Sequence, residues 1–148
     1  MEGPILYPSG AVSEPVRRTI NPPELKDARS IGYNHAIVQD GTFYTAGQVA
    51  MDGDSEVVAD DIEGQAQKVW ENIGVLLEEI DGEYADIAKV TTHIIDPAER
   101  YDGYKAVYRE VFGDGPYPCH TVLGVESLAH EDYLVEVEIE VPLAAGEG

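Results

Sequence analysis

Apolar and polar residues alternate strictly near the carboxyl end of the chain. From Leu134 to Val141, every second residue is a valine or an isoleucine, and glutamates occupy three of the positions between them. Successive side chains of a strand point to opposite faces of a sheet, so the pattern predicts a strand with one buried face. Its other face, with Glu136, Glu138 and Glu140, is either a solvated outer surface or the edge of a site.

Four further short runs of residues favour strands. Two of them, His35–Gln39 and Thr42–Ala46, flank Asp40-Gly41, and Asp-Gly between such runs is a strong signal for a tight hairpin. The other two predicted strands are Ile87–Ile95 and Cys119–Val125.

Two stretches carry the period of a helix. Between Asp60 and Ile80 apolar residues recur every three or four positions and form one stripe, and Asp60 and Asp61 suit the positive end of a helix. A shorter helix over Ala98–Phe112 follows Asp96-Pro97, because proline is favoured in the first turn. Its inward residues are predicted to be Tyr101, Tyr104, Tyr108, Val111 and Phe112.

The order of these elements predicts the fold class. A hairpin, a helix, a strand, a helix and two strands make an α+β, two-layer sandwich in which both helices cover one face of a mixed sheet. We expect one domain over residues 21–148, preceded by an N-terminal extension over residues 1–20 that is rich in proline and glycine. The other face of the sheet lacks a cover of its own, which predicts a symmetric oligomer.

The net charge of the chain limits the kinds of partner that it can bind. The chain has 29 acidic and 9 basic side chains, a net charge of −20, and the acids are scattered over all segments. This balance argues against a nucleic-acid partner, which needs a basic face, and favours a halophilic protein with an acidic surface suited to concentrated salt.

No apolar run approaches the roughly 20 residues of a membrane helix, no signal peptide is recognisable, and a single cysteine fits a reducing compartment. We therefore expect a cytoplasmic protein with no membrane contact.

Several motifs, in this order and spacing, resemble those of the RidA (YjgF) family. They are Gly-Thr-Phe-Tyr-Thr-Ala-Gly-Gln (41–48), Lys-Val-Thr-Thr-His-Ile-Ile-Asp (89–96), Tyr-Pro-Cys-His-Thr-Val (117–122) and Leu-Val-Glu-Val-Glu (134–138). The resemblance implies a chorismate-mutase-like fold and a homotrimer with sites in the clefts between subunits. It also implies cofactor-free hydrolysis of reactive imines and enamines, with 2-imino acids giving 2-keto acids and ammonia.

The resemblance also implies site residues. Tyr33 and Gly47 match a tyrosine and a glycine of the family pocket, and Glu136 matches the glutamate that handles water, with Glu138 as the alternative register. Two positions depart from the family: Ala46 stands where a serine is found, and His120 stands where an arginine holds the substrate carboxylate. An imidazole does not replace the bidentate fork of a guanidinium.

Ordinary structural interpretations stand beside these. His120 is either a weaker anion contact or acid–base group, or a cleft histidine bonded to a neighbour. Lys105 and Arg109, on the second predicted helix, either supply the lost positive charge to a substrate or lie on the surface. Cys119 and His120 are strand neighbours and point to opposite faces, so we expect a buried thiol and no Cys–His pair.

The remaining polar candidates predict no further site. His35, His93 and His130 lack the spacing of metal ligands, so no metal site is predicted. Gln65 and Asn72 are expected at the surface or the caps of the first helix.

Two functions remain open from the sequence. One is a diverged RidA-like deaminase or hydrolase of a small imine or enamine, with Glu136 and His120 as catalytic residues and Tyr33, Gly47, Ala46 and Lys105 as substrate contacts. The other is a non-catalytic homotrimer that binds a small metabolite or a partner enzyme in the same clefts. A ribonuclease role, also attached to members of this family, conflicts with the net charge.

Overall fold

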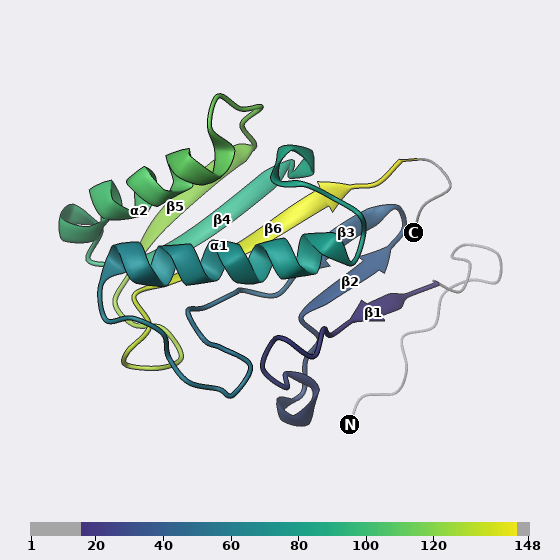
Figure 1. The fold of residues 1–148 in the computed structure, drawn as a ribbon, viewed down its shortest axis with the longest axis horizontal. Helices are drawn as coiled ribbons and strands as arrows, with labels where there is room; N and C mark the ends of the chain where they lie inside the picture. The colour runs from purple at the N-terminus through teal and green to yellow at the C-terminus, as the bar shows by residue number, and fades with distance from the viewer. Residues whose placement is uncertain (1–15, 145–148) are drawn as a thin grey trace, which may run out of the picture.

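A computed structural model describes residues 16–144. One sheet with the strand order β1-β2-β3-β6-β4-β5 runs through it (Figure 1). All neighbouring strands are antiparallel except β4 and β5, which are parallel. The elements are β1 (Arg18–Ile20), η1 (Arg29–Ile31), β2 (Ala36–Gln39), β3 (Thr42–Thr45), α1 (Ile62–Glu78), η2 (Tyr84–Asp86), β4 (Lys89–Ile95), α2 (Pro97–Phe112), β5 (Cys119–Val125) and β6 (Val135–Pro142).

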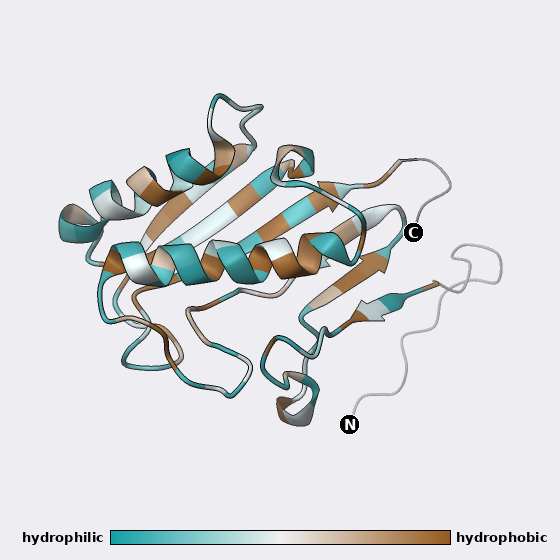
Figure 2. Ribbon diagram, in the orientation of Figure 1, coloured by the Kyte–Doolittle hydropathy of each residue, from teal (hydrophilic) through white to brown (hydrophobic). Residues whose placement is uncertain are grey.

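Both helices lie on the same face of the sheet, which confirms the predicted α+β sandwich (Figure 1). The apolar stripe of α1 is buried as expected, and Figure 2 shows hydrophobic bands alternating with hydrophilic ones along that helix. Asp61 caps α1 by accepting a hydrogen bond from the Gly64 amide at 3.0 Å. No helix within residues 16–144 is long and apolar enough to cross a membrane.

The core lies between the helices and the sheet. The inward residues of β6 are 0–2% exposed, as their alternation predicts. Trp70 of α1 packs edge-to-face on Phe112 of α2, with ring centroids 5.4 Å apart, and so joins the two helices. Of the tyrosines predicted to point inward from α2, Tyr104 and Tyr108 are buried, whereas Tyr101 is exposed.

A sixth strand lies where the sequence predicts only an extension. Arg18–Ile20 forms β1, pairs with β2 and buries Ile20. The Arg18 guanidinium donates a hydrogen bond to the Glu79 carbonyl at the carboxyl end of α1, at 2.9 Å. Three residues are too few for an alternation signal, which explains why this strand escaped prediction. Residues 1–15 of the predicted extension lie outside the described residues.

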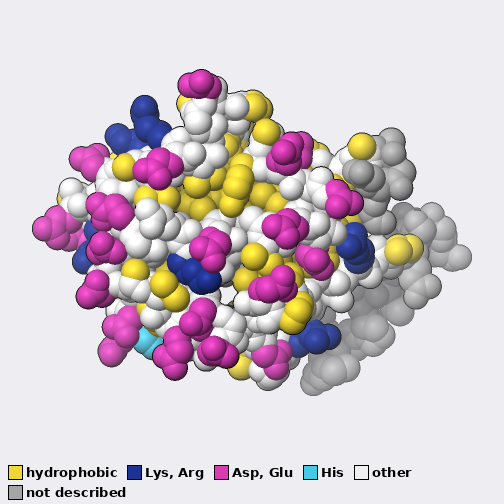
Figure 3. All heavy atoms as spheres, viewed as in Figure 1, with side chains coloured by type: hydrophobic (Ala, Val, Ile, Leu, Met, Phe, Trp, Pro, Cys, Tyr) yellow, Lys and Arg dark blue, Asp and Glu magenta, His cyan; other side chains and the backbone are white. Residues whose placement is uncertain are grey.

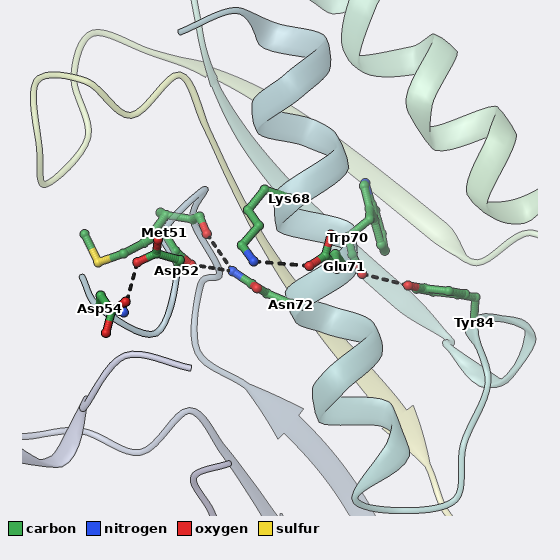
Figure 4. Close-up of polar contacts among 9 residues, drawn as sticks. Met51, Asp52, Asp54, Lys68, Trp70, Glu71, Asn72 and Tyr84 are labelled. Carbon is green, nitrogen blue, oxygen red and sulfur yellow. Dashed lines mark hydrogen bonds and ion pairs between the residues drawn. The ribbon is translucent and has the colours of Figure 1, made fainter. Parts of the chain in front are cut away.

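Two helix amides predicted at the surface or at the helix caps are in fact buried in the middle of α1. Gln65 donates to the Asp132 carbonyl at 2.7 Å and accepts from the Leu134 amide at 2.8 Å. Asn72 donates to the carbonyls of Val49 and Met51 at 3.1 and 3.0 Å, and Figure 4 shows it reaching from α1 to that segment. Through the side chains of Gln65 and Asn72, α1 holds both the loop after β3 and the loop before β6 in place.

Strand register assigns each outward side chain to a face, because directly paired residues point the same way. Glu136 pairs with His93 of β4, and His93 pairs with Leu123 of β5, so all three lie on the face without helices. Leu123 and Tyr44, on that face, are 46% and 40% exposed. This face contains both apolar and acidic side chains, and no helix of residues 16–144 covers it.

Candidate functional site

One pocket gathers most of the candidate residues. It has a volume of about 450 Å³ and lies where the loops around β2 and β3 meet the start of β6. We call it the Glu136 pocket. Its lining includes the predicted candidates Tyr33, Ala46, Gly47 and Glu136, and it also includes Lys26, His130 and Tyr133.

Gly47 and Glu136 are pressed together in this pocket. A Cβ atom at position 47 would lie 2.6 Å from both Cδ and Oε2 of Glu136, closer than real Cβ contacts allow. The two segments are fixed by backbone hydrogen bonds between Gln48 and Val137, at 2.7 and 3.0 Å. Glycine at position 47 therefore leaves the space that the carboxyl group of Glu136 occupies.

The carboxyl group of Glu136 is half-buried, and burial raises its pKa above the ordinary value. The charges of His93 and Lys26 lower the pKa, and the carboxylate of Glu138 raises it, but desolvation is the largest effect. Within residues 16–144, no group donates a hydrogen bond to this carboxyl group. Its oxygens are thus available to a ligand or to water, with a proton affinity above that of an exposed glutamate.

Sequence reasoning missed Lys26, the cation of the pocket. The Lys26 ammonium group lies 5.6 Å from the centre of the Tyr33 ring. The carbonyl of Lys26 accepts a hydrogen bond from Nε2 of the buried His35 at 2.8 Å, and burial lowers the pKa of His35. Gln48 Nε2 lies 3.3 Å from His35 Nδ1, so neutral His35 with its proton on Nε2 satisfies both partners. No periodicity marks these residues, because Lys26, Tyr33 and His35 lie in the irregular segment before β2 and Gln48 lies in an isolated bridge after β3.

His120 lies elsewhere. Its Nε2 is 2.9 Å from Thr92 Oγ1 and 3.2 Å from the Tyr104 hydroxyl, and its ring stacks on Tyr108 with centroids 4.5 Å apart. Burial lowers the pKa of His120, which favours the neutral ring. The residue paired with it, Val90, is buried beneath the helices, so His120 faces the helices.

Within one chain, therefore, Glu136 and His120 lie on opposite faces of the sheet and line different pockets. Lys105 lines the pocket of His120 and not that of Glu136. As expected, no Cys119–His120 pair forms, because the two point to opposite faces. Cys119 itself is exposed, contrary to the prediction of a buried thiol, because β5 is the edge strand of the sheet.

The second pocket, which we call the tyrosine pocket, lies between α2 and β5. It has a volume of about 320 Å³ and is lined by Tyr101, Tyr104, Lys105, Tyr108, Arg109, Tyr117 and His120. In the part of the chain that the structure describes, no group of three or more histidine, cysteine or acidic side chains is arranged to hold a metal ion.

The fold and the pocket with its carboxyl group define a class of small α+β proteins, in which two helices cover one face of a mixed sheet. A Rid family protein of this class, YyfA from Yersinia pestis, has a structure that superposes with a TM-score of 0.79. It is 25% identical to this chain and covers 86% of it, and 100% of YyfA is covered. Residues 26–142 match the family described as endoribonuclease L-PSP, and the chain belongs to this RidA/YjgF (RutC) family.

Named relatives extend the comparison. A RutC family protein of Pyrococcus abyssi is 34% identical over 115 residues, which are 76% of this chain and 88% of the relative. The human protein named 2-iminobutanoate/2-iminopropanoate deaminase is 25% identical over 119 residues, which are 79% of this chain and 84% of that protein. Both alignments cover most of the domain described above.

Proposed function

We propose that the Glu136 pocket hydrolyses small reactive imines or enamines to the carbonyl compound and ammonia. The observation that carries the proposal is the half-buried carboxyl group of Glu136, which has a raised pKa, lies against Gly47 and accepts no hydrogen bond from residues 16–144. The deaminase name of the human relative supports this choice of reaction. The ribonuclease in the family description fits less well, because 9 basic side chains against 29 acidic ones disfavour a phosphate backbone.

The reaction needs a group that moves protons. In the proposed mechanism, Glu136 as carboxylate takes a proton from water as the water oxygen bonds to the imine carbon, and it passes that proton to the nitrogen. The resulting carbinolamine then loses ammonia: Glu136 takes the hydroxyl proton and returns it to the nitrogen as the C–N bond breaks. One water is consumed per imine, and nothing is oxidised or reduced, so the proposal includes no cofactor.

Lys26 gives the pocket a preference for anionic substrates in this proposal. Its ammonium group is near enough to Glu136 to lower the pKa of that residue. A carboxylate beside the imine carbon would pair with this ammonium as a point charge, a less directional contact than a bidentate guanidinium. Tyr33 and Tyr133 would bound the rest of a small substrate. In a homotrimer, a neighbouring subunit would complete the cleft.

Binding without turnover is the second candidate, and two observations favour it. His120, which matches the family arginine by resemblance, is held by Thr92 and Tyr104 on the opposite face of the sheet from Glu136. Ala46 brings no hydroxyl to the Glu136 pocket. In this alternative, the same cleft binds a small metabolite or a partner enzyme and leaves it unchanged.

A 2-imino acid generated in situ tests the proposal. An amino-acid oxidase acting on alanine releases 2-iminopropanoate, and we expect the purified protein in concentrated salt to accelerate pyruvate formation over a no-protein control. Glu136→Gln should lower this rate by about 10²- to 10⁴-fold, the contribution typical of a general acid–base group. Glu140→Gln is the matched control, because Glu140 is an exposed glutamate on the same face of β6.

The outcomes separate the two functions. No acceleration by the wild-type protein, or full activity of Glu136→Gln, would exclude this hydrolysis. Saturable binding of pyruvate, seen by calorimetry without any turnover of the imine, would support the binding-only alternative.

A further inference from the structure

His93 lies beside the proposed catalytic carboxyl group, and the mechanism above gives it no role. It stands directly opposite Glu136 in the register of β4 and β6, so the two side chains are neighbours on the face of the sheet without helices. Directly paired residues have Cβ atoms about 4.5–5.5 Å apart, a gap that an imidazole and a carboxyl group together span. Because β6 lies between β3 and β4, Glu136 has Gly47 on the β3 side and His93 on the β4 side.

Both groups lack a hydrogen-bond partner within residues 16–144. Nδ1 of His93 is buried and bonds to none of these residues, and the carboxyl oxygens of Glu136 accept no hydrogen bond from them. Buried polar atoms without a partner are rare in folded proteins, so each one calls for an explanation. An imidazole nitrogen can donate a proton and a carboxylate can only accept one. The two unsatisfied groups are therefore complementary.

The charges that face His93 are carboxylates. From β6, Glu136 is paired with His93, and Glu138 lies one pair further along the same face, opposite Thr91. From β5, the paired residue is Leu123, which brings no charge. Burial raises the pKa of Glu136, the charge of His93 is the largest of the effects that lower it, and the carboxylate of Glu138 raises it. On the sheet, His93 thus favours the charged form of Glu136.

We propose that His93 is the positioning residue for Glu136: its Nδ1–H donates a hydrogen bond to one carboxylate oxygen and leaves the other oxygen to act on water. Rotation about the side-chain bonds of Glu136 brings the carboxyl group from its place against Gly47 to within reach of Nδ1. The inference rests on the proposed hydrolysis, in which Glu136 must begin as a carboxylate. Lys26 acts on the same carboxylate from the loop before β2. His93 touches no substrate and acts only through Glu136.

A carbon-13 titration of Glu136 tests the pairing without any need for turnover. The full chain is labelled at the carboxyl carbon of its glutamate side chains, and the Glu136 signal is assigned by its loss in Glu136→Gln. We expect His93→Gln to move the titration midpoint of Glu136 to higher pH, because a charge that lowers its pKa is gone. Glu138→Gln should move the midpoint to lower pH, because that carboxylate raises the pKa.

Two controls accompany this titration. Thr91→Val changes a half-buried residue on the same face of β4, opposite Glu138, and should leave the Glu136 midpoint unchanged. In the wild type, the nitrogen-15 resonance of His93 Nδ1 should change at the same pH as the Glu136 carbon. That coupling needs no substitution of His93, so it tests the pair even if a His93 variant does not fold.

The kinetics of imine hydrolysis separate positioning from packing. The acid limb of kcat/KM against pH reports the ionisation of the free enzyme, and it should shift to higher pH in His93→Gln and to lower pH in Glu138→Gln. His93→Ala removes both the donor and the ring beside Glu136. It should lower kcat by about tenfold or more above the acid limb, with KM nearly unchanged, and His93→Gln, which keeps a donor amide, should restore most of that kcat.

The outcomes distinguish this inference from the proposed function. A shifted Glu136 midpoint in His93→Gln, in a protein that hydrolyses no imine, would support the pair and reject the hydrolysis. Hydrolysis with one acid limb and one Glu136 midpoint shared by the wild type, His93→Gln and Thr91→Val would overturn the role of His93. A loss of kcat in His93→Ala without any shift in His93→Gln would assign His93 to packing alone.

Discussion

The contact between Gly47 and Glu136 connects a backbone position directly to the proposed chemistry. In Gly47→Ala, the new Cβ would meet the carboxyl group at 2.6 Å, so the side chain of Glu136 must move. A displacement of about 1 Å in a catalytic group lowers rates by about 10²-fold, and we expect a loss of that size in imine hydrolysis. Steady-state pyruvate formation measures it.

The double variant Gly47→Ala/Glu136→Ala tests the cause. If the clash destabilises Gly47→Ala, truncating the carboxyl group should restore the unfolding free energy, so the two substitutions will not be additive. Additive losses in chemical denaturation would show that the alanine methyl disturbs something other than Glu136.

The raised pKa of Glu136 has a consequence for stability. Below the ordinary value of 4.5, the carboxyl group is protonated in both the folded and unfolded states and carries no penalty. As pH rises through the raised folded pKa, the unfolded state loses its proton more readily, so burial of Glu136 destabilises the protein in the neutral range.

We therefore expect Glu136→Gln to unfold at a higher temperature than the wild type at about pH 8, with the difference shrinking towards about pH 4. The exposed glutamate variant Glu140→Gln should show a smaller pH-dependent difference. Thermal scans of the three proteins across this range measure it, and a gain that grows in acid would contradict the assigned direction.

Residues carried by motifs were predictable, and those carried by loops were not. Strand alternation and resemblance together placed Glu136 and Gly47, and the structure puts them in one pocket with Tyr33. Lys26 and Tyr133 lie in irregular segments, where position along the chain says nothing about proximity. Their places in the lining of the Glu136 pocket become visible only in the folded sheet, in which β6 is paired with its neighbours.

At the scale of elements, periodicity predicted β6 and α1 well, whereas residue type misplaced two polar residues of the helix. Gln65 and Asn72 differ by seven positions, with the buried Val69 between them, and so continue the buried stripe. Polar type alone suggested the surface. Their phase on the stripe was the available signal, and a polar residue in that phase needs buried backbone partners.

Because Gln65 has such partners, substituting it tests how much its hydrogen bonds contribute to stability. Gln65→Leu leaves the carbonyl of Asp132 and the amide of Leu134 without this partner, and each unsatisfied buried group costs about 1–3 kcal/mol. We expect a loss of roughly 2–5 kcal/mol in unfolding free energy, together with slower imine hydrolysis, because the loop before β6 carries Tyr133. Gln67→Leu, on the exposed side of α1, is the matched control and should change stability by less than about 0.5 kcal/mol. Equal effects of the two substitutions in denaturant titrations would contradict the role of Gln65.

At the scale of the molecule, the class of fold was predictable, whereas the strand order was not. Local patterns give the elements, but β6 pairs with β3 and β4 over long stretches of chain that no local pattern records. Adaptation to concentrated salt, which we infer from the net charge of −20, stays a prediction. On the face viewed in Figure 3, the basic side chains are few and lie among acidic and apolar ones.

The open face of the sheet leads to a prediction about assembly. We expect a homotrimer in concentrated salt, where repulsion between chains of net charge −20 is screened, with a mass about three times 16.1 kDa. Leu123→Asp places a charge on that face and should shift light-scattering mass towards the monomer. Val16→Asp, at a position 79% exposed before β1, is the control and should leave the mass unchanged. A monomeric wild type in concentrated salt would contradict the prediction.

The position of β6 also constrains how the chain is made. It follows the other five strands in chain order, yet it lies in the interior of the sheet, between β3 and β4. During synthesis, β1–β3 and the β4–α2–β5 unit leave the ribosome before the strand that joins them. Each half carries an unpaired strand edge until then. A ribosome paused after β5 has left the exit tunnel, but before β6 has, would hold two unjoined halves with exposed strand edges, and this interval is when the nascent chain is open to wrong pairing.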